Sequence, residues 1–175
     1  RLQVGEGGAT VPLPSLVAVS SVDSLRFGGS QRFTGFNGPT DFVVQTSGRL
    51  SVAEGSQVAI EEGAKVKWSL SGGQEIGLDG VQLANPDGEH LRLASNEGDV
   101  RLANSEVISG DGVLMEANGL VRIDNSRVQA DFVEIRGRDR IRLAGANFAA
   151  GPDSVLEMLA GNRITATTTD LRMFS

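Results

Sequence analysis

The chain has no cysteine and no tyrosine, and it contains a single histidine and a single tryptophan. Without cysteine the protein can form neither a disulfide scaffold nor a thiolate zinc site, and a cysteine nucleophile is excluded. A Ser-His-Asp triad or a histidine-rich metal site would depend on His90 alone. The composition therefore gives little support to catalysis by nucleophile or metal, and an enzyme is not expected.

The sequence also lacks long apolar runs and an excess of positive charge. No run of about 18 apolar residues occurs, so no membrane-spanning helix is predicted. The 16 lysine and arginine residues are outnumbered by 22 aspartate and glutamate residues, which gives a net charge of −6. Because binding to a phosphate backbone requires clustered positive charge, nucleic acid is not expected as the main partner.

Glycine, in contrast, is abundant at 23 of 175 residues, about twice its usual share, and many glycines fall within an internal repeat. The repeat places apolar residues at its first, third and eighth positions and Asn, Gly or Thr at its fifth. It occurs at 100–107, 121–128 and 141–148, and more weakly at 76–83 and 164–171. A second alternating apolar pair follows most copies. With looser copies included, repeats begin near residues 25, 50, 76, 100, 121, 141 and 164, at intervals of 20 to 26 residues.

Apolar alternation with a period of two predicts short β-strands, and no helical periodicity is sustained anywhere in the chain. Three such strands per copy, stacked copy upon copy, predict an all-β fold: a right-handed parallel β-helix (β-solenoid) of about seven rungs. We expect this domain to span 25–175. Residues 1–24 contain Pro12 and Pro14 and are expected to form an irregular segment that caps the first rung or docks on a neighbouring subunit.

Stacking at the repeat period predicts which residues lie above one another. Two core columns are expected, because equivalent apolar positions of successive copies should point into the interior. The first consists of Ile76, Val100, Val121, Ile141 and Ile164, and the second of Leu78, Leu102, Ile123 and Leu143. The fifth repeat position is expected to bend the chain, since glycine and asparagine accept a positive φ at low cost. The bend residues are Gly80, Asn104, Asn125 and Gly145.

These repeats resemble those of filamentous-haemagglutinin-like bacterial surface proteins. The resemblance rests on stretches such as Val-Arg-Ile-Asp-Asn-Ser-Arg-Val at 121–128 and Ile-Ser-Gly-Asp-Gly-Val at 108–113. It covers residues 50–171, and 25–49 more loosely. The resemblance implies an exported, elongated bacterial protein that is adhesive or forms filaments. Bactofilin-type cytoskeletal solenoids share the architecture, but shorter and more uniform rungs are expected for them.

Two outward-facing sets of charged side chains are the candidates for ligand binding. Asp87, Asp111, Asp131 and Asp153 lie one per rung at the corner where repeat length varies, and a stack of carboxylates could bind Ca²⁺. Ordinary turn sequences also explain them. Arg101, Arg122 and Arg142 share the second repeat position and should form a row able to bind an anionic ligand. A salt-bridged, solvated face also explains the row and is the preferred interpretation.

The function expected from these observations is structural. The chain is predicted to be a subunit or segment of an extracellular or cell-surface filament or adhesin. Its expected partner is another copy stacked head to tail, or further β-helix of the same chain. The alternative is a β-helix that binds a surface glycan or degrades a polysaccharide through the Asp corner or the Arg row. His90 is expected to be a surface residue and Trp68 a core or cap residue, and no cofactor is expected.

Overall fold

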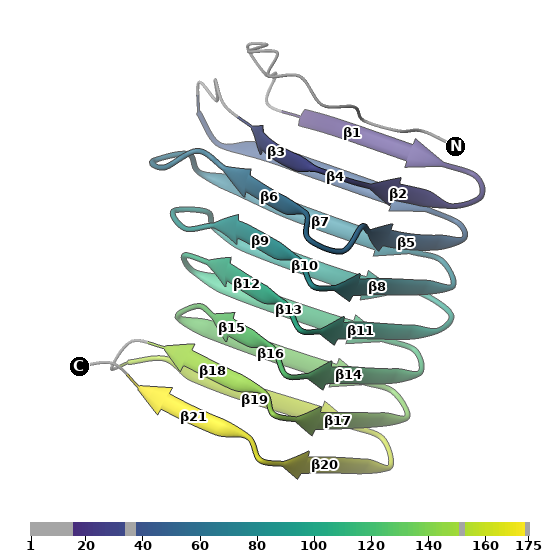
Figure 1. Cartoon of the computed structure of the whole chain (residues 1–175), viewed down its shortest axis with the longest axis vertical. Coiled ribbons are helices and arrows are strands. Elements are labelled where there is room, and N and C mark those ends of the chain that lie inside the picture. Colours follow the sequence, from purple (N-terminus) through teal and green to yellow (C-terminus); the bar gives the residue numbers. More distant parts are fainter. Residues whose placement is uncertain (1–15, 34–37, 151–152, 174–175) are drawn as a thin grey trace.

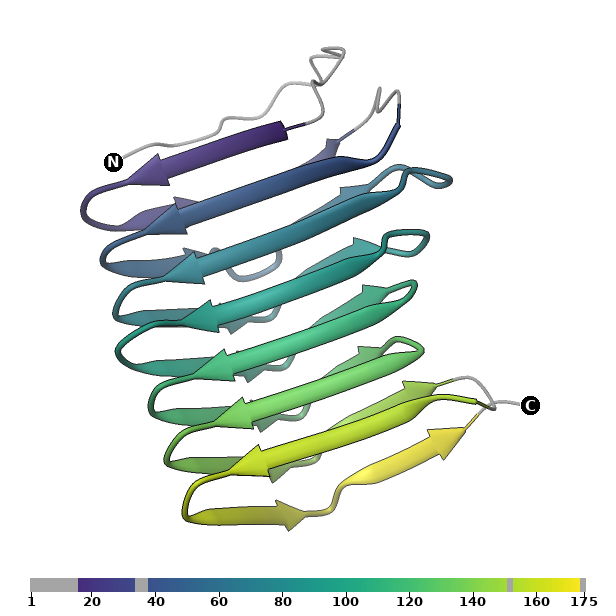
Figure 2. The same ribbon diagram turned by 180° about the vertical axis from the view of Figure 1, so that it is seen from behind.

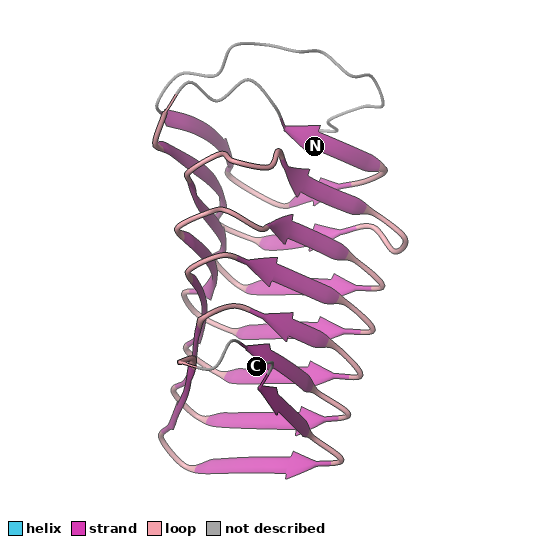
Figure 3. Ribbon diagram, turned by 90° about the vertical axis from the view of Figure 1, so that its left-hand side faces the viewer, coloured by secondary structure: helices cyan, strands magenta, loops and turns pink. Residues whose placement is uncertain are grey.

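The computed structural model describes residues 16–33, 38–150 and 153–173 of the chain. These residues form strands joined by short connections and contain no helix (Figure 3). No helix capable of spanning a membrane therefore occurs within the described ranges.

The 21 strands are arranged in three seven-stranded sheets, and each sheet takes every third strand of the chain. Sheet 1 contains β1 (Leu16–Ser21), β4 (Thr40–Thr46), β7 (Val66–Gly72), β10 (His90–Ser95), β13 (Gly112–Ala117), β16 (Phe132–Gly137) and β19 (Val155–Ala160). Sheet 2 contains β2 (Leu25–Phe27), β5 (Arg49–Val52), β8 (Glu75–Asp79), β11 (Asp99–Ala103), β14 (Leu120–Asp124), β17 (Arg140–Ala144) and β20 (Arg163–Thr167). Sheet 3 contains β3 (Ser30–Phe33), β6 (Gln57–Ile60), β9 (Gln82–Asn85), β12 (Glu106–Ser109), β15 (Arg127–Gln129), β18 (Asn147–Ala150) and β21 (Asp170–Met173).

The chain coils in the right-handed sense, as the sequence predicts. In Figure 1 the front strands of sheets 2 and 3 run from right to left, the rear strands of sheet 1 run from left to right, and the chain descends. The view from behind shows sheet 1 as an even stack of long strands (Figure 2). Each strand pairs in parallel with the strand three places further along the chain, so β11 pairs with β14 and β14 with β17. The fold is a parallel β-solenoid with three strands per rung.

The solenoid begins earlier than residue 25, where the repeat pattern placed its start. β1 belongs to the segment 1–24, which was expected to be irregular, and it pairs in parallel with β4. The physical reason is that both prolines of the segment precede the strand, so every residue of β1 keeps its backbone N–H. Residues 1–15, which carry the rest of the predicted cap or docking segment, lie outside the described residues.

The core is a continuous apolar column enclosed by the three sheets. The registers align Ile76 with Val100, Val100 with Val121, and Leu102 with Ile123. Along most central strands inward positions are buried and outward positions are not, and this alternation produced the repeat pattern in the sequence. Both predicted columns lie in the core, and all their members are buried except Ile164 on the last rung.

Candidate functional site

The bend residues form a row at the corner between sheets 2 and 3. Asn104 and Asn125 have φ angles of 48° and 45°, and Gly80 and Gly145 have φ angles of 63° and 64°. Thr168 occupies the same position of the last rung with a φ of 51°. A left-handed residue at this position turns the chain from one sheet into the next, which explains why glycine and asparagine recur there.

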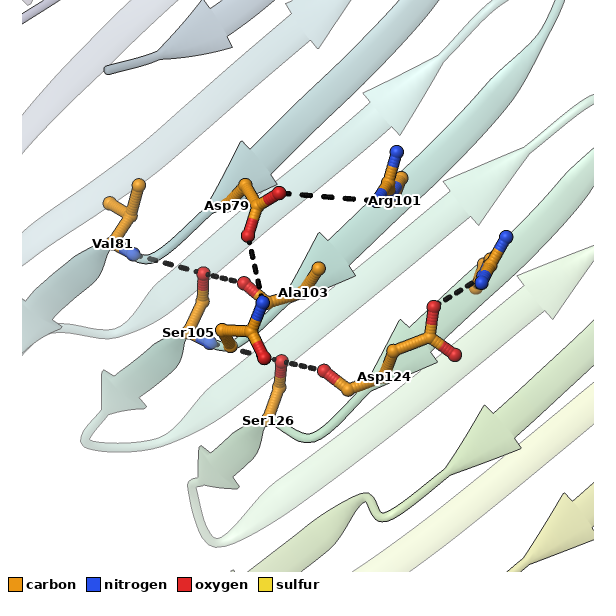
Figure 4. A network of polar contacts seen from close by, with 9 residues as sticks. Asp79, Val81, Arg101, Ala103, Ser105, Asp124 and Ser126 are labelled. Atoms are coloured by element: carbon orange, nitrogen blue, oxygen red, sulfur yellow. Dashed lines mark hydrogen bonds and ion pairs between the residues drawn. The ribbon is translucent and has the colours of Figure 1, made fainter. Parts of the chain in front are cut away.

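Buried serines directly follow the two asparagines of this row in the chain, and their hydroxyl groups form a hydrogen-bonded ladder (Figure 4). The backbone N–H of Val81 donates to Ser105 Oγ (3.0 Å), and the N–H of Ser105 donates to Ser126 Oγ (3.1 Å). Each hydroxyl then donates to a carbonyl of its own rung: Ser105 Oγ to Ala103 O (2.6 Å) and Ser126 Oγ to Asp124 O (2.7 Å). The serines thus supply acceptors to backbone N–H groups at the bend.

Replacing Ser126 with alanine is expected to lower the free energy of unfolding by about 1–3 kcal/mol. The Ser105 N–H would lose its acceptor within a buried corner, and an unpaired buried donor carries that cost. Urea denaturation followed by circular dichroism measures the change. Ser51→Ala is the control, because Ser51 faces outward from β5. Equal losses for both variants would contradict a structural role for the ladder.

The Arg row predicted from the sequence is aligned along sheet 2. Arg101 is in register with Arg122, and Arg122 with Arg142. Arg101 Nη2 lies 3.9 Å from Asp79 Oδ2, and Arg122 forms a close ion pair with Asp124. Arg142 has no ion-pair partner among the residues that the structure describes. Two of the three guanidinium groups are therefore partly neutralised.

The Asp corner joins sheet 3 to sheet 1. Asp87, Asp111 and Asp131 line one pocket of about 600 Å³, whereas Asp153 is not part of its lining. Asp87 Oδ2 accepts a hydrogen bond from the backbone N–H of Gly63 (2.7 Å), which fixes it against the turn of the preceding rung. No group of three or more His, Asp or Glu side chains is placed to hold a metal ion within the described ranges.

The two lone residues singled out from the sequence lie in different environments. His90 is exposed at the first position of β10. Trp68 is buried in β7 and contacts Phe42 edge to face, with ring centroids 5.9 Å apart. Phe33 also packs against Phe42, at a centroid distance of 4.7 Å. Trp68 thus belongs to an aromatic cluster in the N-terminal part of the core and offers no exposed face to a sugar.

A charge ladder on the outer face of sheet 1 was not found by sequence reasoning. Arg92 Nη2 lies 2.7 Å from Glu116 Oε2, and Arg136 Nη1 lies 3.3 Å from Glu116 Oε1. Hydrogen bonding to the adjacent Glu134 carboxylate raises the pKa of the Arg136 guanidinium above its ordinary value. The recurrence of oppositely charged residues at intervals of 20 and 24 along the chain was the available signal. The ladder links three rungs and leaves Glu116 neutralised from both sides.

The last rung carries an apolar surface. Among the side chains whose exposure the structure describes, five large apolar ones are exposed, and four of them lie on the last two rungs: Phe132, Val155 and Leu159 at outward positions of sheet 1, and Ile164 at an inward position of sheet 2. Ile164 continues the first core column, yet 47% of it is exposed, whereas its neighbour Ile141 is fully buried. Among the strands that the structure describes, β19, β20 and β21 each have a paired neighbour on one side only. This end therefore presents both apolar side chains and one edge of each sheet.

Comparison with known proteins provides no relative: no family model, no curated protein and no solved structure matches the chain. The function of the chain is therefore inferred from the arrangement of its own residues.

Proposed function

We propose that this chain is a structural β-solenoid that assembles end to end, as a subunit or segment of an extracellular bacterial filament or adhesin. The single observation that carries this proposal is the apolar, unpaired edge formed by β19, β20 and β21. No catalytic role is assigned to the chain. The resemblance of its repeats to those of bacterial surface proteins supports the extracellular location.

Backbone pairing and hydrophobic burial would act together at this edge. Each rung already stacks on the next through parallel pairing of all three strands, at a spacing of about 4.8 Å. Another rung placed on β19–β21 would satisfy the free backbone groups and cover Ile164. Large exposed apolar patches on soluble proteins typically mark interaction surfaces.

Two of the three strands in the first rung of a second copy match this edge in length. β1 and β19 both contain six residues and β3 and β21 both contain four, whereas β2 contains three and β20 five. Val19 and Phe33, on the first rung, are only partly buried and pack against the core. Head-to-tail stacking would therefore bring apolar residues of both ends together. Because such contacts are heterologous and need not close, they produce filaments.

The test is the size of the assembly formed by the purified chain. Light scattering coupled to size-exclusion chromatography and negative-stain electron microscopy are expected to show concentration-dependent oligomers. Ile164→Lys should leave monomers, because a desolvated ammonium group within the interface is costly. Leu114→Lys places the same charge on the outer face of sheet 1, away from the edge, and should assemble like the parent. A parent that stays monomeric at high concentration would refute the proposal.

A further inference from the structure

The corner between sheets 2 and 3 is hollowed into a groove of about 590 Å³ that lies along several successive rungs. It is lined by a row of polar side chains at the first position of five successive sheet 3 strands, β6 to β18: Gln57, Gln82, Glu106, Arg127 and Asn147. The registers stack these five residues directly above one another. The bend residues Gly80, Asn104, Asn125 and Gly145 also line the groove.

The groove is polar and carries no net charge. Glu106 and Arg127 are its charged members, and Arg127 Nη1 lies 3.4 Å from Glu106 Oε1. Gln82 Nε2 donates to Glu106 Oε2 (3.3 Å). Gln57 and Asn147 have side-chain amides without a hydrogen-bond partner in the described structure. The groove thus offers donors and acceptors in a repeating series, with the charged pair internally neutralised.

An extended peptide has little to bind here. The backbone N–H groups along the corner already pair between rungs: Gly80 N with Ala103 O (2.9 Å), Asn104 N with Asp124 O (3.0 Å) and Asn147 N with Ser126 O (2.8 Å). Strand addition requires free backbone groups, and side-chain recognition requires apolar pockets. Val81 is the one large aliphatic residue of the lining, and it is buried.

We propose that this groove binds a neutral, extended polysaccharide lying parallel to the solenoid axis. Polyhydroxyl chains are recognised by amide, carboxylate and guanidinium groups, which are the groups that the row provides. The rung spacing of about 4.8 Å is close to the rise per sugar of an extended glycan chain, so each successive sugar lies against one side chain of the row. Charge balance favours a neutral polymer over an acidic one.

The row of bend residues also supports the binding of a polysaccharide in this groove. Gly80 and Gly145 carry no side chain and leave the groove open, while Asn104 and Asn125 add amides between them. Asn104 Nδ2 is engaged with Asp79 Oδ1 (3.0 Å), whereas the Asn125 amide has no such partner among the described residues. No aromatic ring lines the groove, so each sugar is held weakly and affinity accumulates along the polymer.

The experiment is affinity electrophoresis of the chain in native gels that contain hydroxyethylcellulose, a neutral β-linked glucan. The chain is expected to be retarded in proportion to glucan concentration. The triple variant Gln57→Ala, Gln82→Ala, Asn147→Ala should bind about tenfold more weakly, because it loses several modest hydrogen bonds. The control is the double variant Gln45→Ala, Gln74→Ala. It removes one glutamine from sheet 1 and one from the corner between sheets 1 and 2, neither of which lines the groove, and it should bind like the parent.

Several outcomes would overturn this assignment. Absence of retardation by hydroxyethylcellulose is one, and equal retardation of the triple variant is another. Retardation by alginate alone would point to an acidic ligand and thus to the Arg row instead. Circular dichroism verifies that the triple variant is folded, and Gln82→Ala alone serves as the milder change. The Ile164→Lys chain should still bind the glucan, which separates this test from that of end-to-end assembly.

Discussion

Replacing Ile123 with alanine is expected to lower the free energy of unfolding by about 3–4 kcal/mol. Ile123 is fully buried in the second core column and is in register with Leu102 above and Leu143 below. The rungs are fixed at the spacing of the backbone pairing, so neighbouring strands cannot close the cavity left by the removed atoms. Chemical denaturation followed by circular dichroism measures the loss.

The matched control is Ile164→Ala. Ile164 is the same residue type in the neighbouring column of sheet 2, but it lies on the open rung and is 47% exposed. Its replacement in the monomer is expected to cost less than about 1 kcal/mol, because little additional apolar area is exposed and no closed cavity forms. Comparable losses at the two positions would show that the core is not packed as described.

Gly98→Ala is expected to destabilise the solenoid by about 2–3 kcal/mol. Gly98 lies at the corner between sheets 1 and 2, where a Cβ atom would come within 1.9 Å of the Gln74 carbonyl oxygen of the preceding rung. Gly48 and Gly73 are equally crowded, with a carbonyl oxygen 2.0 Å from the position of each Cβ. Since the obstructing atom belongs to the backbone, relief requires the rungs to separate.

Gly77→Ala provides the comparison for this variant. Gly77 lies within β8 on the outer face, and a Cβ atom there would meet Glu75 Oε1 at 3.8 Å, an ordinary contact. The change should be neutral or slightly stabilising, because alanine has less backbone entropy to lose than glycine. Thermal and urea unfolding of both variants distinguish a crowded corner from a general intolerance of glycine replacement. Similar stabilities for the two variants would contradict the crowding.

The repeat in the sequence was sufficient to predict the fold. Alternation fixes which side chains face inward, and a constant interval between copies fixes which residues stack. That reasoning correctly predicted a right-handed parallel solenoid with three strands per rung. It placed the start of the stack too late, because the copies were counted from their sheet 2 strand and β1, the sheet 1 strand before it, lacks the sharp polar–apolar alternation of the later copies.

The side-chain and backbone contacts between rungs, unlike the fold, could not be predicted from the repeat. The serine ladder depends on hydroxyl orientation at a bend, and Ser105 and Ser126 appeared in the sequence only as small residues after asparagine. The corner glycines are required by the approach of a carbonyl from the preceding rung, which a linear sequence does not show. The Arg row could be aligned from the repeat, but its pairing with Asp79 and Asp124 depends on side-chain reach.

The sequence by itself determined the architecture of this protein, since the side-chain period of a strand and the repeat interval together leave one way to bury the apolar residues. The tertiary structure alone decided which surfaces are available to a partner. Exposure, groove shape and the neutralisation of charges arise from atoms on different rungs meeting in space. Ile141 and Ile164 occupy the same repeat position, and only the stacking of the rungs makes the first a core residue and the second an exposed one.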